Sequence, residues 1–177
     1  MGVTLCAVSK GYRYSKNKDD MIGKMFNSVD ISYGGFMFFR NALLKFVSGG
    51  AFSHIVDDDL FGKSFSWCWF KDKTLVVIMT KEQLENDDDY DKEYFDKLNW
   101  LKNNYPKLYD IYPFLVHCDC EGEMPLEQVE KLLPIVETFY TYNKHNYGYS
   151  AWEYNFTKEF IKVLKDAIAH KGKLYFC

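Results

Sequence analysis

Residues 117–123, with the sequence His-Cys-Asp-Cys-Glu-Gly-Glu, hold the densest group of chemically versatile side chains in the protein. An extended backbone sends alternate side chains to the same side of a strand. If this segment is extended, His117, Asp119, Glu121 and Glu123 share one face. One imidazole beside three carboxylates predicts a functional site, and more than one kind of chemistry fits it.

Three interpretations of this face remain open. Asp119, Glu121 and Glu123 could hold a hard divalent cation such as Mg²⁺ or Mn²⁺, which prefers oxygen ligands, with His117 as a further ligand or a nearby base. The four side chains could instead work without a metal as a catalytic acid and base. Alternatively, the segment is a solvated loop in which Glu121 or Glu123 stabilises the amino end of the following helix.

The two cysteines of this segment do not predict a zinc site. Cys118 and Cys120 are closer than the usual spacing of zinc-binding cysteine pairs, and no second pair lies nearby in the sequence. In an extended segment they face away from the carboxylates, where small apolar side chains pack well. We therefore expect buried thiols.

Two acidic runs and one tyrosine-rich loop are candidates for binding a partner. The run at 87–91 resembles the start of a calcium loop, but Lys92 and Leu98 occupy the positions of the required glycine and glutamate, so an EF-hand is rejected. Acidic and tyrosine-rich surfaces suit contact with a basic groove. The alternative is that the acidic runs are solvated loops and that the tyrosine-rich segment is an ordinary connection between the last two helices. The predicted partner-binding residues are Asp57, Asp58, Asp59, Asp87, Asp88, Asp89, Tyr142, Tyr147 and Tyr149.

The composition disfavours a broad nucleic-acid surface. The net charge is −3, and only Arg13 and Arg40 among the 22 basic residues are arginines. An extended nucleic-acid footprint requires a basic face and is usually richer in arginine. A local basic cluster near the N-terminus, formed by Lys10, Arg13, Lys16 and Lys18, is either a functional patch or a solvated loop.

No apolar run approaches the roughly 18 residues that span a bilayer, and the first residues lack the pattern of a signal peptide. We therefore expect a soluble, cytoplasmic protein with no membrane partner. The five cysteines are an odd number and predict reduced thiols rather than a disulfide framework.

Four helices are predicted, each from apolar residues at spacings of three and four joined to a start or stop signal. The first opens at 32–35 and stops at 48–50, and the second enters at 87–91 and ends at 103–106. The third starts at Pro125 and reaches Tyr140, with a kink expected at Pro134. The fourth runs from a capping box at 150–153 to 170–172, where Gly172 suits a left-handed cap.

Strands are predicted at 3–8, in a hairpin formed by 64–70 and 74–80, at 111–117 and at 174–177. Strands and helices alternate without regular βαβ spacing and without a glycine-rich phosphate loop. The sequence therefore predicts a single α+β domain over residues 1–177, with a small mixed or antiparallel sheet packed against about four helices.

Two segments together resemble a family of small uncharacterised bacterial and phage proteins with a YGGF-like segment and an H-S-D-C-E-G-E-like segment. The matching residues here are Tyr33-Gly34-Gly35-Phe36 with Arg40, and residues 117–123, in which Cys118 replaces the serine. The family has no settled activity. Together with the Lys-, Asn- and Tyr-rich composition, the resemblance implies a phage- or plasmid-type protein similar to inhibitors of bacterial defence, including anti-CRISPR proteins.

Two functional hypotheses follow. In the first, the protein inhibits a defence nuclease by docking to a CRISPR-Cas effector or its guide RNA. Its acidic, tyrosine-rich surface would face the basic nucleic-acid channel of the effector. In the second, it is a metal-dependent hydrolase or ribonuclease, with Asp119, Glu121 and Glu123 as Mg²⁺ or Mn²⁺ ligands and His117 as the general acid or base. An inhibitor that cuts a guide RNA would combine the two.

Overall fold

The computed structural model describes residues 2–15, 21–52, 54–56, 70–71, 74–76, 96, 98–117, 122–145 and 151–177. The chain divides into two compact units. The first combines Met1–Phe36 with His117–Cys177, and the second is Met37–Val116. Each unit is considered by itself below.

The first unit contains a four-stranded antiparallel sheet with the order β2-β1-β7-β6. Its strands are β1 (Gly2–Val8), β2 (Met25–Ser32), β6 (Gly122–Met124) and β7 (Lys173–Phe176). The predicted strand at 3–8 and the predicted final strand are thus confirmed, and they are neighbours at the centre of the sheet. Beyond the end of β7, the Thr4 amide donates to the Cys177 carbonyl at 2.7 Å.

Both faces of β1 are buried. Val3, Leu5 and Ala7 alternate with Cys6 and Val8, and all five side chains are almost inaccessible to solvent. Cys6 and Val8 form a cluster with Tyr12, against which Tyr175 and Cys177 pack. The other face carries Val3, Leu5 and Ala7, because successive side chains point to opposite faces. We call the face with Cys6 the cysteine face and the other the helix face.

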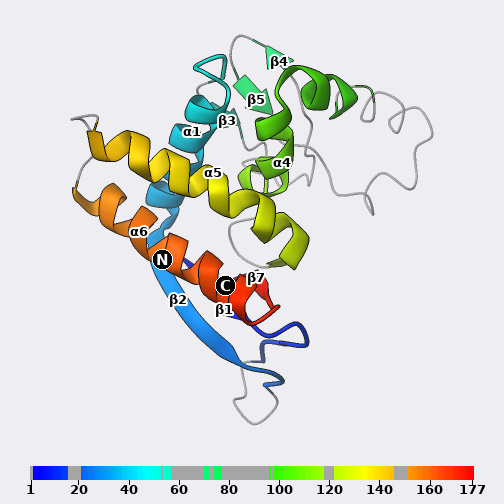
Figure 1. Ribbon diagram of the computed structural model, residues 1–177, viewed down its shortest axis with the longest axis vertical. Helices are drawn as coiled ribbons and strands as arrows, with labels where there is room; N and C mark the ends of the chain where they lie inside the picture. Colours follow the sequence, from blue (N-terminus) through cyan, green and yellow to red (C-terminus); the bar gives the residue numbers. More distant parts are fainter. Residues whose placement is uncertain are drawn as a thin grey trace. The chain divides into compact units, whose positions relative to one another are not determined.

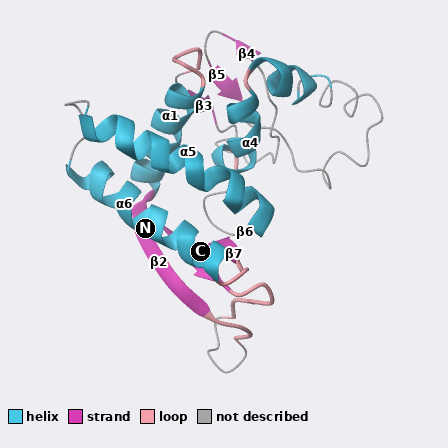
Figure 2. Cartoon of the chain, in the orientation of Figure 1, coloured by secondary structure: helices cyan, strands magenta, loops and turns pink. Residues whose placement is uncertain are grey.

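Helices α5 (Leu126–His145) and α6 (Ala151–Ala169) lie side by side across the helix face (Figures 1 and 2). The predicted spacing of apolar residues is confirmed in both. The buried stripe of α5 is Val129, Leu132, Val136 and Phe139, and that of α6 is Phe156, Phe160, Val163, Leu164 and Ala167. Burying a large apolar side chain contributes roughly 1.5–3 kcal/mol, so these two stripes are a major source of stability.

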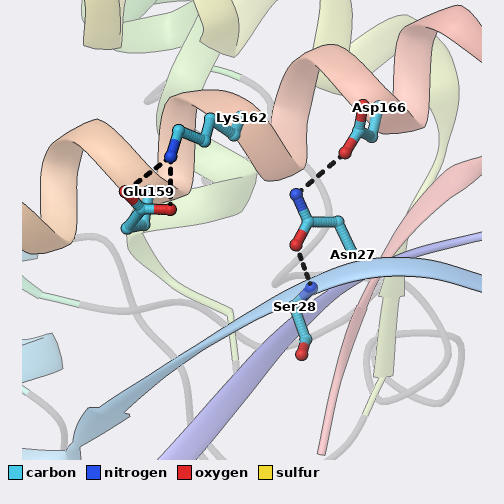
Figure 3. Close-up of polar contacts among 5 residues, drawn as sticks. All are labelled: Asn27, Ser28, Glu159, Lys162 and Asp166. Atoms are coloured by element: carbon cyan, nitrogen blue, oxygen red, sulfur yellow. Dashed lines mark hydrogen bonds and ion pairs between the residues drawn. The ribbon is translucent and has the colours of Figure 1, made fainter.

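Polar contacts tie the edge strand β2 to α6 (Figure 3). The Asn27 side-chain amide donates to the Asp166 carboxylate at 2.8 Å, and the Asn27 side-chain oxygen accepts from the Ser28 amide at 2.9 Å. The Phe26 ring stacks on His170 with the ring centroids 3.9 Å apart. Strand β2 was not predicted, because only Val29 and Ile31 carry the apolar alternation of a strand.

The end of α6 corrects one expectation about glycine. The left-handed residue is Lys171, with φ of 49°, and not Gly172. The Lys171 amide donates to the Ile168 carbonyl at 3.0 Å and the Gly172 amide to the Ala167 carbonyl at 2.8 Å, the two bonds of a Schellman cap. Gly172 is needed for a different reason, since a Cβ there would stand 2.1 Å from the Val8 carbonyl oxygen.

Helix α1 (Tyr33–Val47) begins in the first unit and continues in the second. Its predicted start and stop are confirmed: the Gly35 amide donates to the Ser32 hydroxyl at 3.1 Å, and Gly49 and Gly50 take positive φ values just after the helix. Within the first unit, the Phe36 ring lies 6.3 Å from the Phe176 ring.

In the second unit the predicted strand at 111–117 is wrong, because α4 (Pro106–Leu115) occupies most of it. Pro106 stands at the helix start, where its missing amide proton costs nothing, rather than acting as a stop signal. The buried residues Leu108, Ile111, Tyr112 and Leu115 follow helical spacing. A short apolar run cannot be assigned to strand or helix by periodicity alone.

A three-stranded sheet of the second unit has the order β3-β5-β4, with β3 (His54–Val56), β4 (Phe70–Lys71) and β5 (Thr74–Val76). Strands β4 and β5 are antiparallel, as the predicted hairpin requires, whereas β3 and β5 are parallel. The remainder of that hairpin, the helix entry at 87–91 and the capping serine at 150 lie outside the described residues.

The fold is therefore α+β, as predicted, with an antiparallel sheet packed against helices. The single-domain assignment of residues 1–177 stays a prediction. None of the helices in the described ranges combines the length and apolar character needed to cross a membrane.

Gly172→Ala is expected to destabilise the protein by about 1–3 kcal/mol, because its methyl group would collide with a backbone carbonyl that belongs to the centre of the sheet. Urea unfolding followed by circular dichroism measures the change. Gly34→Ala is the matched control: nothing lies within 4 Å of its Cβ position, and alanine favours a helix, so a neutral or slightly stabilising effect is expected. Equal losses in both variants would contradict the assigned role of Gly172.

Cys6 should make stability fall in alkali. Burial, with the neighbouring Cys177 thiol 3.7 Å away, raises the pKa of the Cys6 thiol from 9.0 to about 12. The folded protein holds this proton where the unfolded chain releases it. Stability linked to Cys6 is therefore complete below pH 9 and is lost towards pH 12, by roughly 1.4 kcal/mol per pH unit.

Cys6→Ala should flatten this part of the curve of unfolding free energy against pH. Burial also raises the pKa of Tyr12, so the wild type and the variant are compared at each pH, which cancels the tyrosine contribution. Identical slopes above pH 9 would show that Cys6 keeps no proton specifically in the folded state.

Candidate functional site

The His117 side chain lies against the sheet. Its ring stacks on Phe176, with centroids 3.7 Å apart and planes 8° from parallel. The ring also covers Gly122, where a Cβ would meet its Cε1 and Nε2 atoms at 2.6 and 2.8 Å. Gly122 has φ of +135°, a value that favours glycine. Stacking on Phe176 and the absence of a side chain at Gly122 thus fix the position of the His117 ring.

Glu123 points to the opposite side of the sheet. Its neighbours on β6, Gly122 and Met124, pair with Phe176 and Leu174, whereas Glu123 pairs with Tyr175 on the cysteine face. The Glu123 carboxylate forms an ion pair with Lys173. The Lys173 side chain is only 11% exposed, while that of Glu123 is 56% exposed. This carboxylate therefore pairs with the ammonium group of a lysine whose side chain is largely buried.

His117 and Glu123, the two ends of the acidic segment, are thus not brought together. His117 precedes β6 and is not part of a strand, so the alternation expected from an extended segment does not apply to it. Asp119 and Glu121, with Cys118 and Cys120, lie outside the described residues. Within the described ranges, no group of three or more His, Cys, Asp or Glu side chains is arranged to hold a metal ion.

Of the residues predicted to bind a partner, the structure describes Tyr142 alone. It lies on α5, is 55% exposed, and is one of the large hydrophobic residues at the surface. The other tyrosines of that group, Tyr147 and Tyr149, lie outside the described residues. So do the two aspartate runs, Asp57, Asp58 and Asp59 with Asp87, Asp88 and Asp89.

Carboxylates on α5 and α6 are balanced by nearby lysines. Glu159 contacts Lys162 at 2.7 Å within α6 (Figure 3), and Glu137 of α5 contacts Lys165 of α6 at the same distance. Such exposed pairs contribute little to stability, about 0–1 kcal/mol each, but they leave these helix surfaces with mixed charge. A strongly acidic docking surface must therefore come from other parts of the chain.

Sequence reasoning missed the residues that position the two ends of the segment. Phe176 holds the His117 ring and Lys173 pairs with Glu123, and both belong to β7, which lies 50 to 59 residues further along the chain. No local spacing signals contacts of this range. Gly122 was the one available sign, because a glycine between two glutamates marks a place where a side chain does not fit.

Comparisons of the chain with protein-family models, with curated proteins and with solved structures found no significant match. The function must therefore be argued from the residues and their geometry, together with the resemblance described above.

Glu123→Gln is expected to lower the free energy of unfolding by about 1 kcal/mol, because it leaves Lys173, whose side chain is largely buried, without its counter-charge. In a Lys173→Met background the same change should cost almost nothing. Glu159→Gln is the control, with both partners about half exposed and an expected effect below about 0.5 kcal/mol. Chemical denaturation of the four variants completes the test, and equal costs in both backgrounds would refute the coupling.

Proposed function

We propose that this protein is a binding inhibitor of phage or plasmid type. It blocks a bacterial defence nuclease, a CRISPR-Cas effector, by docking to the effector or to its guide RNA inside the host cell. The surface that docks to the effector is acidic and tyrosine-rich. The resemblance of residues 33–36 and 117–123 to a phage and bacterial family suggests the class of target.

The observation that carries a binding function, rather than a metal-dependent hydrolase, is the divergence of His117 and Glu123. His117 is used as a packing side chain against Phe176, and Glu123 neutralises Lys173 on the other face. A catalytic acid and a metal-binding carboxylate must converge on one reacting group. The two described ends of the segment point in different directions, which favours a structural use of this segment.

Charge complementarity supports the target class. CRISPR effectors hold their guide–target duplex in a positively charged channel. The aspartate runs at 57–59 and 87–89 concentrate six carboxylates in two short stretches. The exposed Tyr142 offers the kind of large amphipathic side chain that anchors protein interfaces. Opposite charges would speed the encounter and exclude partners of the wrong charge.

The direct test incubates the purified protein with a guide-loaded Cas9-type effector and its target DNA, with and without magnesium in the preincubation, and reads both nucleic acids on denaturing gels. Blocked cleavage with an intact guide is expected. Replacing Asp57, Asp58 and Asp59 by asparagine should raise the half-inhibitory concentration by about tenfold or more, since several charge pairs are lost together. Neutralising Glu127, Glu130 and Glu159 removes the same charge from α5 and α6 and should change it less than about twofold.

Two results would contradict the proposal. Normal cleavage at a large excess of the protein would exclude inhibition of that effector. Cleavage of the guide that requires divalent metal, and that is lost in Asp119→Asn or Glu121→Gln, would establish a metal-dependent ribonuclease instead. Tyr142→Ala adds a separate check on the docking surface, because a loss of inhibition there involves no change of charge.

A further inference from the structure

Beyond β1 and β2 the chain continues in two loop segments that are joined by backbone hydrogen bonds and are drawn as loops at the lower end of the first unit in Figure 1. The Ser9 amide donates to the Lys24 carbonyl at 2.8 Å. Further out, Arg13 and Ile22 exchange backbone hydrogen bonds of 2.9 and 3.3 Å. We call residues 9–15 and 21–25 the basic ribbon.

Side chains on its inner side anchor the basic ribbon to the sheet. Tyr12 is 4% exposed, meets Tyr175 edge to face with centroids 5.4 Å apart, and donates its hydroxyl to the Met21 sulfur at 3.8 Å. Gly23 has φ of +90°, and a Cβ there would stand 2.8 Å from the Tyr12 Cα. The packing of Tyr12 thus holds the base of the ribbon and leaves no space for a side chain at position 23.

The exposed side chains of the basic ribbon combine positive charge with apolar surface. Lys10, Arg13 and Lys24 are all exposed. Single exposed apolar residues are ordinary, whereas clusters of them mark interaction sites. Half of the eight exposed large hydrophobic residues in the described part of the protein belong to this ribbon: Tyr14, Met21, Ile22 and Met25, each 41–55% exposed.

The charge of this region is opposite to that of the whole chain. Residues 9–25 contain five basic residues and two aspartates, a formal charge of +3, while the protein carries −3. A basic region on an acidic protein attracts an anionic partner locally, and the negative charge of the rest of the protein limits the contact to a small area.

We propose that the basic ribbon binds single-stranded RNA. Basic and apolar side chains are interleaved along it, since Arg13 lies directly opposite Ile22 and next to Tyr14. A single strand offers the matching alternation of phosphates and bases. The Arg13 and Lys24 cations contact phosphates, and the Tyr14 ring stacks on a base. An anionic bilayer would instead require a continuous apolar face that inserts below its charges.

The binding assay measures the fluorescence anisotropy of a labelled oligouridine of about 15 nucleotides, at about 50 mM salt, with the full-length protein. We expect a dissociation constant in the range of about 1–100 μM, which weakens as salt is raised. Arg13→Glu with Lys24→Glu should weaken binding by about tenfold or more. The control, Lys107→Glu with Lys158→Glu, makes the same charge change at exposed lysines outside the ribbon and should cost less than about twofold.

The aromatic contact is tested separately. Tyr14→Ala should weaken RNA binding by about fivefold or more, and Tyr14→Phe should restore it, because the ring and not the hydroxyl stacks on the base. Circular dichroism of each variant verifies folding, which we expect to be preserved because these side chains are exposed.

Several results would overturn the inference. Oligouridine binding that is absent at high protein concentration, or that is weakened equally by the ribbon variant and its control, would exclude a specific role for the ribbon. Co-sedimentation with phosphatidylserine vesicles that depends on Arg13 and Lys24, without RNA binding, would assign the ribbon to a membrane surface. The inference does not depend on the proposed inhibition of a defence nuclease, which has its own assay.

Discussion

Strand β7 is the element on which the described part of the first unit depends. It is four residues long and pairs on one edge with β1 and on the other with β6. Phe176 carries the His117 ring, Lys173 carries the charge that Glu123 balances, and Tyr175 supports Tyr12 at the base of the basic ribbon. One short strand thus positions residues of the acidic segment, of the ribbon and of the core.

The arrangement of the sheet also affects the order in which its elements form during folding. The pairing of β7 with β1 joins residues about 170 positions apart, and closing such a loop reduces chain entropy before any contact compensates for it. In contrast, α5 and α6 are close in sequence and have strong apolar stripes. We expect the helix pair to form early and the sheet to be completed late, with β1 held between two partners that come from opposite ends of the chain.

The sequence predicted the elements whose signals are local. The stripe of α6, the glycine stop of α1 and the strand at 3–8 could be predicted because periodicity and turn residues act over a few positions. The errors arose where long-range packing decides. Most of the 111–117 run is helical because Leu108, Ile111 and Leu115 are buried on one side of α4. Strand β2 forms because it pairs with β1 and because its Asn27 side chain donates a hydrogen bond to Asp166 of α6.

The candidate site shows the same division. Residue types identified the segment 117–123, but alternation along an extended chain could not foresee that His117 would stand outside β6, above Gly122. Nor could Lys173 be found as the counter-charge of Glu123, since the two are 50 residues apart. Gly172 was identified as special for the wrong reason, because its limit is the space beside Val8 rather than its backbone torsion.

The position of Cys6 also makes the sheet experimentally observable. Cys6 is fully buried and belongs to β1, which lies between β2 and β7. The raised pKa of its thiol keeps it protonated and therefore unreactive in the folded protein. An alkylating reagent can modify it only when local unfolding exposes the cysteine face. The rate at which a mass label accumulates on the Cys6 peptide therefore measures how often this part of the sheet unfolds locally. No engineered probe is needed for this measurement.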